Sequence, residues 1–135
     1  MMRGAVLAEG RSYQLQALLD AVFFREIPEF ELAAVIAPQE DSPALSKARS
    51  AGVAGTVVDP ELFPSTASYC KAVSNKLKDM DIDVVVGPAM GGIVYAYELG
   101  KQLGKRAIFT ERVDNVMTLK RFSIKPGEKC IIAED

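Results

Sequence analysis

Histidine and tryptophan are absent from this sequence, and cysteine occurs only at positions 70 and 130. The absence of histidine removes both the commonest general base and the commonest zinc ligand. Cys70 and Cys130 lack metal-ligand spacing, so we expect reduced thiols in a cytoplasmic protein, with no metal site and no cofactor. There is also no apolar run long enough to span a bilayer, and no charged-then-apolar signal segment opens the chain.

Neither sign of charge dominates. The 16 Lys+Arg residues stand against 18 Asp+Glu residues, which gives a net charge of -2. This balance argues against nucleic acid or an anionic membrane as a partner. The 135 residues, 49% of them hydrophobic, are typical of one ordinary globular domain with a substantial core, spanning residues 1–135.

Apolar runs and amphipathic segments alternate along the chain. The pattern predicts strands at 3–8, 31–37, 55–58, 83–86, 106–109 and 129–133. It predicts helices at 12–24, 42–51, 65–79 and 93–103, and a hairpin-type excursion at 116–124. This alternation is typical of a three-layer α/β/α, Rossmann-like domain with a mostly parallel sheet. Right-handed crossovers predict the strand order 3-2-1-4-5, with strand 83–86 away from the sheet edges.

Two turns between a strand and a helix are candidate anion sites, because unpaired backbone N–H groups and the helix dipole meet at such turns. The first contains Gly10, Arg11 and Ser12. The second is the Gly-rich segment 87–92, whose adjacent glycines allow close approach to a diphosphate. The alternative at each position is a plain connection, with Ser12 as an N-cap in the first and a tight turn in the second.

Several segments of the first part resemble glycinamide ribonucleotide formyltransferase over roughly residues 2–86. They are AVL at 5–7, LQALLD at 15–20, ARSAGV at 48–53 and VVDPELFPS at 57–65. The resemblance implies that Gly10–Ser12 correspond to the loop that holds the substrate phosphate. In that family the catalytic Asn, His and Asp follow the fourth strand, and this chain diverges before reaching them. We therefore do not expect formyl transfer.

The second part resembles orotate phosphoribosyltransferase from about Asp83 to Asp135. The resemblance rests on GPAMGG at 87–92, AYEL at 96–99, RAIFTER at 106–112, MTLKR at 117–121, IKPGEK at 124–129 and the final Glu134-Asp135. It implies vestigial phosphate binding at Ala89, Met90, Gly91 and Gly92, as at Gly10, Arg11 and Ser12. It also implies a vestigial diphosphate contact at Arg112 and vestigial ribose binding at Glu134 and Asp135. The family continues with a 5′-phosphate cradle that is not present here.

The two resemblances meet near residue 83, with a formyltransferase-like segment at 1–82 and a phosphoribosyltransferase-like segment at 83–135. We interpret the chain as an engineered chimera, a de novo α/β protein without catalytic activity. The alternative is a module that binds phosphate, sulfate or a phosphoribosyl ligand weakly. In this interpretation strands 3–8 and 106–109 take both edges of strand 83–86. Strand 129–133 should then be displaced to an outer edge or pair with a second subunit, as in a homodimer.

Overall fold

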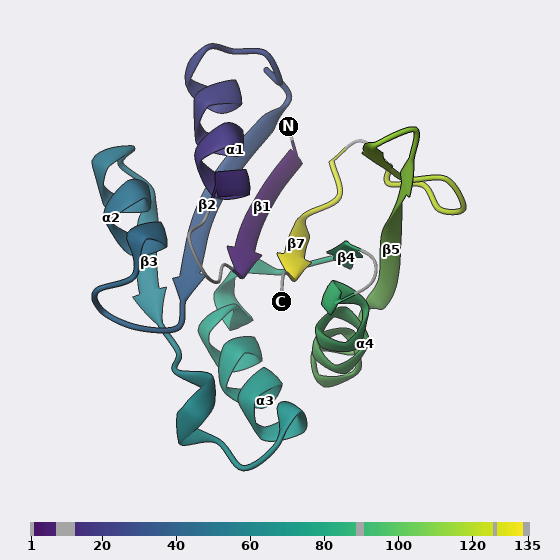
Figure 1. Cartoon of the computed structure of the whole chain (residues 1–135). Helices are drawn as coiled ribbons and strands as arrows, with labels where there is room; N and C mark the ends of the chain where they lie inside the picture. Colours follow the sequence, from purple (N-terminus) through teal and green to yellow (C-terminus); the bar gives the residue numbers. More distant parts are fainter. Residues whose placement is uncertain (1, 8–12, 89–90, 126, 134–135) are drawn as a thin grey trace.

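The computed structural model describes residues 2–7, 13–88, 91–125 and 127–133. They form one seven-stranded sheet with the order β3-β2-β1-β7-β4-β5-β6 and helices on both faces (Figure 1). The strands are β1 (Met2–Leu7), β2 (Phe30–Ala37), β3 (Ala54–Val57), β4 (Val84–Pro88), β5 (Arg106–Val113), β6 (Val116–Thr118) and β7 (Cys130–Ala133). The helices are α1 (Tyr13–Phe23), α2 (Pro43–Ser50), α3 (Thr66–Lys76) and α4 (Gly91–Leu103), with 3-10 turns η1 (Pro60–Leu62) and η2 (Lys78–Met80).

The predicted alternation of strands and helices is confirmed, and β4 lies inside the sheet as expected. Two elements differ in extent. β5 continues to Val113 because its last residues pair with β6 in an antiparallel hairpin. The predicted loop 87–92 is shorter, because Gly87 and Pro88 belong to β4 while Gly91 and Gly92 begin α4.

Residues close to the helix ends in the sequence determine where α2 and α3 begin or end. Ser65 caps α3 in a capping box, in which its hydroxyl accepts from the Ser68 N–H and the Ser68 hydroxyl accepts from the Ser65 N–H. Gly52 follows α2 at a φ of +75°, and the Val53 N–H donates to the Ala48 carbonyl at 2.9 Å. This is a Schellman ending, which a residue without a side chain adopts readily. Ser42 precedes α2 as expected, but its side chain makes no cap hydrogen bond.

The expected position of the last strand is wrong. β7 lies between β1 and β4, parallel to both, with Leu7 paired to Ala133 and Val86 paired to Ile132. The predicted adjacency of the first and fourth strands, and hence the order 3-2-1-4-5, is corrected accordingly. β4 pairs with β5 on one side and with β7 on the other. β1 was expected to pair with β4, but it pairs with β7 on that side. None of the described strands is displaced from the sheet, so this reason for expecting a second subunit no longer holds.

Burial explains the central position of β7. Cys130, Ile131 and Ala133 are buried, and Ile131 and Ala133 pack into the core under α3 and α4. Ile132 packs on the opposite face, in the core under α1 and α2. A strand that is apolar on both faces gains most from an internal position, whereas at an outer edge it would leave apolar surface in water.

The face of β4, β5 and β7 opposite α4 is covered without a helix. Val84, Val86, Ile108 and Cys130 form a buried cluster there. The segment 119–124 supplies its cover through Leu119, Phe122 and Ile124, and Phe30 reaches the cluster from β2. The predicted excursion 116–124 therefore consists of β6, paired to β5, followed by a packed segment without regular structure.

Candidate functional site

The carboxyl ends of β1, β7 and β4 lie side by side (Figure 1). We call this end of the parallel strands the carboxyl edge. The registers place Leu7 beside Ala133, and Ile132 beside Val86. The strand order reverses here: β1 to β3 extend the sheet in one direction, and β4 to β6 extend it in the other. In open α/β sheets, ligands bind just outside such a switch point. The topology thus assigns the candidate site to this edge.

Most of the sequence-predicted site residues lie outside the described residues. These are Gly10, Arg11, Ser12, Ala89, Met90, Glu134 and Asp135. In the sequence, residues 8–12, 89–90 and 134–135 follow β1, β4 and β7. The described carboxyl ends of these three strands lie side by side.

Gly91 and Gly92 form the first turn of α4, directly beyond β4. The amino end of this 13-residue helix therefore lies at the candidate site, and its first turn carries no acidic residue. The dipole of such a helix favours an anion at this end. Gly100, further along α4, allows the helix to pack closely on β5, because a Cβ there would lie 3.0 Å from the Cβ of Ala107.

Arg112 lies on the part of β5 that extends past β4. Thr110 is the last β5 residue paired with β4, so Arg112 lies two residues beyond the end of that pairing. Its exposed guanidinium donates from Nη1 to the Asn115 carbonyl at 3.3 Å, within the β5–β6 hairpin. Arg112 thus lies on the same side of the sheet as the candidate site, and its side chain is bound to the hairpin.

Thr110 was not singled out by its sequence context. It pairs with Pro88 at the carboxyl end of β4. Its Oγ1 atom is buried without a hydrogen-bond partner, the one such side-chain atom in the described part of the chain. Buried hydroxyls are normally satisfied. Thr110 is therefore an additional candidate group at this edge. The alternation of apolar and polar residues along a strand does not distinguish it from other strand residues.

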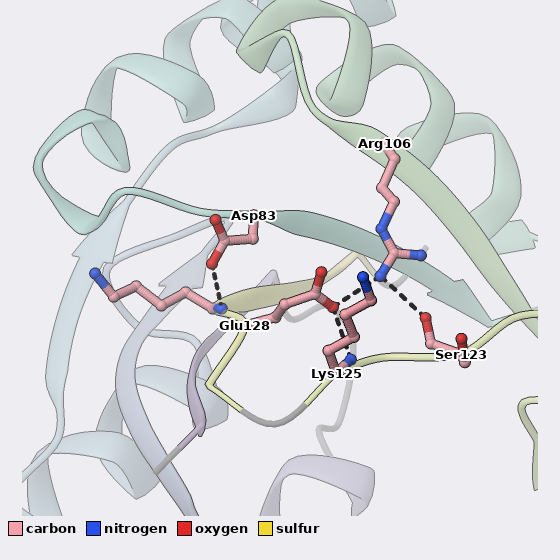
Figure 2. Close-up of polar contacts among 6 residues, drawn as sticks. Asp83, Arg106, Ser123, Lys125 and Glu128 are labelled. Atoms are coloured by element: carbon pink, nitrogen blue, oxygen red, sulfur yellow. Dashed lines mark hydrogen bonds and ion pairs between the residues drawn. The ribbon is translucent and has the colours of Figure 1, made fainter.

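A second polar cluster lies at the opposite, amino end of β4 and β7 (Figure 2). Asp83 Oδ2 accepts from the Lys129 N–H at 2.7 Å, and the Asp83 N–H donates to the Lys129 carbonyl at 2.7 Å. The Arg106 Nη2 donates to Glu128 Oε2 at 2.8 Å and to the Ser123 carbonyl at 3.0 Å. These contacts hold the loop before β7 against β4 and lie away from the candidate site.

Glu128 is the centre of this amino-end cluster. The Lys125 N–H donates to its Oε2 atom at 2.9 Å, in addition to the bond from Arg106. The hydrogen bond from the Lys125 backbone, followed by the hydrogen bond and the charge of Arg106, lowers the pKa of Glu128 below its ordinary value. Glu128 is therefore a charged structural group, because both donors stabilise its ionised form.

The two cysteines are free and buried. Burial, with a smaller contribution from Glu98, raises the pKa of the Cys70 thiol to about 11. Burial likewise raises the pKa of Cys130. Both thiols are protonated at neutral pH, and a thiol in that state is a poor nucleophile. Among the described residues, no group of three or more His, Cys, Asp or Glu is arranged to hold a metal ion.

The sequence is similar to orotate phosphoribosyltransferases over half of its length. It is 50% identical to that of Caldanaerobacter subterraneus subsp. tengcongensis over 68 residues, which is 50% of this chain and 36% of the relative. It is 44% identical to that of Desulforamulus reducens over 71 residues, or 52% of this chain and 37% of the relative. The chain thus spans little more than a third of these curated relatives. No family model matches it.

The similarity extends further towards the amino end than the motifs indicated. The range 83–135 contains 53 residues, whereas the first match covers 68, so about 15 matched residues precede Asp83. The matched part therefore includes most of α3, which packs beside α4 through the ring contact of Tyr69 and Tyr95 at 6.1 Å. The domain boundary near residue 83 stays a prediction.

The fold matches solved glycinamide ribonucleotide transformylases over most of the chain. The transformylase 1 of Symbiobacterium toebii superposes with a TM-score of 0.62 at 27% identity, over 90% of this chain and 55% of that one. The corresponding enzyme of Geobacillus kaustophilus gives 0.64 at 23% identity, over 93% and 63%. No described helix has the length and apolar character needed to cross a membrane. The chain thus combines sequence similarity to a phosphoribosyltransferase with the fold of a formyltransferase.

Proposed function

We propose that the chain is an engineered chimera of two nucleotide-biosynthesis enzyme fragments and that it has no catalytic activity of its own. The observation that carries the proposal is the insertion of β7 between β1 and β4. A strand of the phosphoribosyltransferase-like segment there completes a sheet begun by the formyltransferase-like segment. The two fragments are thereby joined through shared hydrogen bonds and a shared core rather than as separate domains.

The chemistry of the side chains supports an inactive scaffold. The chain has no histidine, and both thiols are buried with raised pKa values. The ion pair between Arg106 and Glu128, joined at 2.8 Å, lies at the amino end of the strands rather than at the switch point. General acid–base catalysis requires a positioned group with a pKa near the working pH.

Two activity assays test this proposal. The full chain is incubated with glycinamide ribonucleotide and a formyl donor, and separately with orotate, phosphoribosyl pyrophosphate and magnesium. We expect product formation equal to that of a heat-denatured sample in both assays. Saturable turnover above that control in either one would overturn the proposal.

A second candidate function is weak binding of a phosphoribosyl ligand at the carboxyl edge. The specific observation in its favour is the convergence of the ends of β1, β7 and β4 beside the amino end of α4. Titration with phosphoribosyl pyrophosphate and magnesium, followed by amide NMR shifts, tests it. We expect saturable shifts at Gly91, Gly92 and Thr110, weakened by Arg112→Ala and unchanged by Arg49→Ala on α2. Shifts confined to surface lysines would contradict this candidate.

A further inference from the structure

The helix-free face of the sheet has a thin cover. Val84, Val86, Ile108 and Cys130 form the buried cluster on this face, and segment 119–124 packs over it. Among the described residues this cluster has four buried members, whereas the two clusters under the helices have fourteen and nine. The hydrophobic contribution grows with the apolar area removed from water. The segment therefore gains less from burial than the helices on the other faces do.

The backbone of segment 119–124 adds little to its attachment. The segment has no regular structure, and among the described residues none of its backbone groups bonds to another backbone group. The chain on either side does form such bonds, β6 with β5 and the Glu128 N–H with the Lys125 carbonyl. A segment that shares no backbone hydrogen bonds with the sheet can leave it without breaking the ladder between the strands.

Apolar side chains supply part of the attachment. Leu119, Phe122 and Ile124 pack against the cluster, and all three are half-buried. The ring of Phe122 also meets that of Phe109 on β5 edge to face, with centroids 5.0 Å apart. A half-buried side chain contributes only part of the free energy that full burial provides. These contacts therefore hold the segment less firmly than a helix with a fully buried face.

Two ion pairs to β5 fasten the segment and the loop that follows it. Arg121 Nε donates to Glu111 Oε2 at 2.7 Å, from a side chain that is 64% exposed. Arg106, 42% exposed, donates to the Ser123 carbonyl at 3.0 Å and to Glu128 Oε2 at 2.8 Å (Figure 2). Ion pairs in contact with water are weak and are screened by salt. This part of the attachment therefore depends on ionic strength.

We propose that segment 119–124 is a salt-sensitive strap, which opens separately from the rest of the sheet and uncovers an apolar face of β4, β5 and β7. Side-chain contacts to one face of the sheet hold the segment, so its release leaves the pairing of β7 with β1 and β4 intact. Segments with few buried contacts and no shared backbone bonds are those that open locally in native proteins. The proposal is independent of the transferase activities and of the carboxyl-edge site.

The absence of tryptophan from the chain permits a test with a single fluorophore. Phe122→Trp places it on the segment, and Phe63→Trp places it against the cluster under α3 and α4 as the matched control. Each full-length variant is unfolded with urea and followed by tryptophan emission and far-UV circular dichroism. We expect emission to change at lower urea than dichroism in Phe122→Trp, and the two signals to coincide in Phe63→Trp. Coincident transitions in both variants would overturn the proposal.

Thiol modification tests the segment with its native side chains. Cys130 lies in the cluster beneath the segment, whereas Cys70 lies in the cluster under α3 and α4. The full chain is treated with iodoacetamide without denaturant, and peptide mass spectrometry follows the alkylation of each cysteine. We expect Cys130 to react at least about ten-fold faster than Cys70, because its exposure requires only local opening. Equal rates would overturn the proposal, because both thiols would then become accessible through global unfolding.

Two charge variants assign the opening to the ion pairs. Glu111→Gln and Glu128→Gln should each speed the alkylation of Cys130 by about two- to five-fold, which corresponds to the strength of exposed ion pairs. Sodium chloride at about 0.5 M should do the same in the native chain, because it screens both pairs. Glu40→Gln, which removes an exposed ion pair to Arg49 on α2, is the matched control and should leave the rate unchanged. A rate that responds to neither variant nor to salt would overturn the proposed control by ion pairs.

Discussion

The ring of Phe30 lies against Gly4, in the space that a β-carbon on Gly4 would occupy. An ideal Cβ there would be 2.8 Å from Cε2 and 2.9 Å from Cζ of Phe30, and 3.2 Å from the carbonyl oxygen of Cys130. Gly4 pairs with Cys130 of β7, while Phe30 packs against both the α1–α2 core and the helix-free cluster under segment 119–124. The contact therefore joins the first strand, the last strand and two hydrophobic clusters.

Gly4→Ala should destabilise the fold by about 1–3 kcal/mol, the usual cost of overpacking a well-filled site. The ring of Phe30 cannot withdraw without leaving both clusters, and the Cys130 carbonyl is fixed by the sheet. Denaturant unfolding at constant m-value measures the loss. The double variant Gly4→Ala with Phe30→Leu should recover part of it, because the smaller side chain vacates the site. Additive losses in the two single variants would contradict direct contact between these residues.

The reciprocal pair of Asp83 and Lys129 should contribute measurably to the position of β7. Asp83→Ala removes the acceptor for the half-buried Lys129 N–H, which should lower the free energy of unfolding by about 1–3 kcal/mol. Asp83→Asn retains an acceptor oxygen and should cost less. Chemical denaturation of both variants measures the difference. A loss no larger than that of Asp79→Ala, an exposed acidic residue on η2, would show that the pair does not stabilise this junction.

The lowered pKa of Glu128 gives stability a defined pH dependence. Because the folded chain binds a proton at Glu128 less readily than the unfolded chain does, protonation favours unfolding. The contribution of Glu128 is fully present above its ordinary value of 4.5 and is lost as the pH falls below it. Thermal unfolding between neutral and acidic pH should therefore show a smaller acid-dependent decrease in Tm for Glu128→Gln than for the native chain. Parallel curves would exclude a role for this carboxylate.

Local sequence patterns predicted the elements well because their signals are local. Ser65 followed by Ser68, Gly52 after an amphipathic segment and the apolar run before Gly87 each determine a helix end or a strand within a few residues. The neighbours of a strand are not encoded in this way. If the contact of the first and fourth strands is treated as fixed, β7 is predicted at an outer edge or paired with a second subunit. Burial of Ile131 and Ala133 on one face and Ile132 on the other instead favours insertion between them.

Only the location of the candidate site, and not the roles of its residues, could be predicted from local sequence patterns. Strand–helix alternation indicates the carboxyl edge, and the described ends of β1, β7 and β4 lie side by side there. The individual roles came from resemblance, and seven of the named residues lie outside the described ranges. Thr110 had no distinguishing pattern. Its importance follows from burial without a hydrogen-bond partner, which depends on tertiary packing that no spacing of residues reveals.

The end of α1 offers a stabilising substitution. Arg25 has a φ of +58°, and the Glu26 N–H donates to the Ala21 carbonyl at 2.9 Å while the Arg25 N–H donates to the Val22 carbonyl at 3.2 Å. This is the same Schellman ending that Gly52 and Gly104 provide for α2 and α4, but with a side chain in the left-handed region.

Arg25→Gly should therefore raise the free energy of unfolding by about 1 kcal/mol, because glycine removes the steric cost of positive φ at this position. The gain exceeds the additional backbone entropy that glycine brings to the unfolded chain. Gly52→Ala is the matched control. A Cβ on Gly52 meets nothing within 4 Å, so the expected loss of about 1 kcal/mol reports the backbone conformation alone. Urea denaturation of both variants should show midpoints that move in opposite directions from that of the native chain. A destabilised Arg25→Gly variant would show that the Arg25 side chain contributes more than its backbone strain costs.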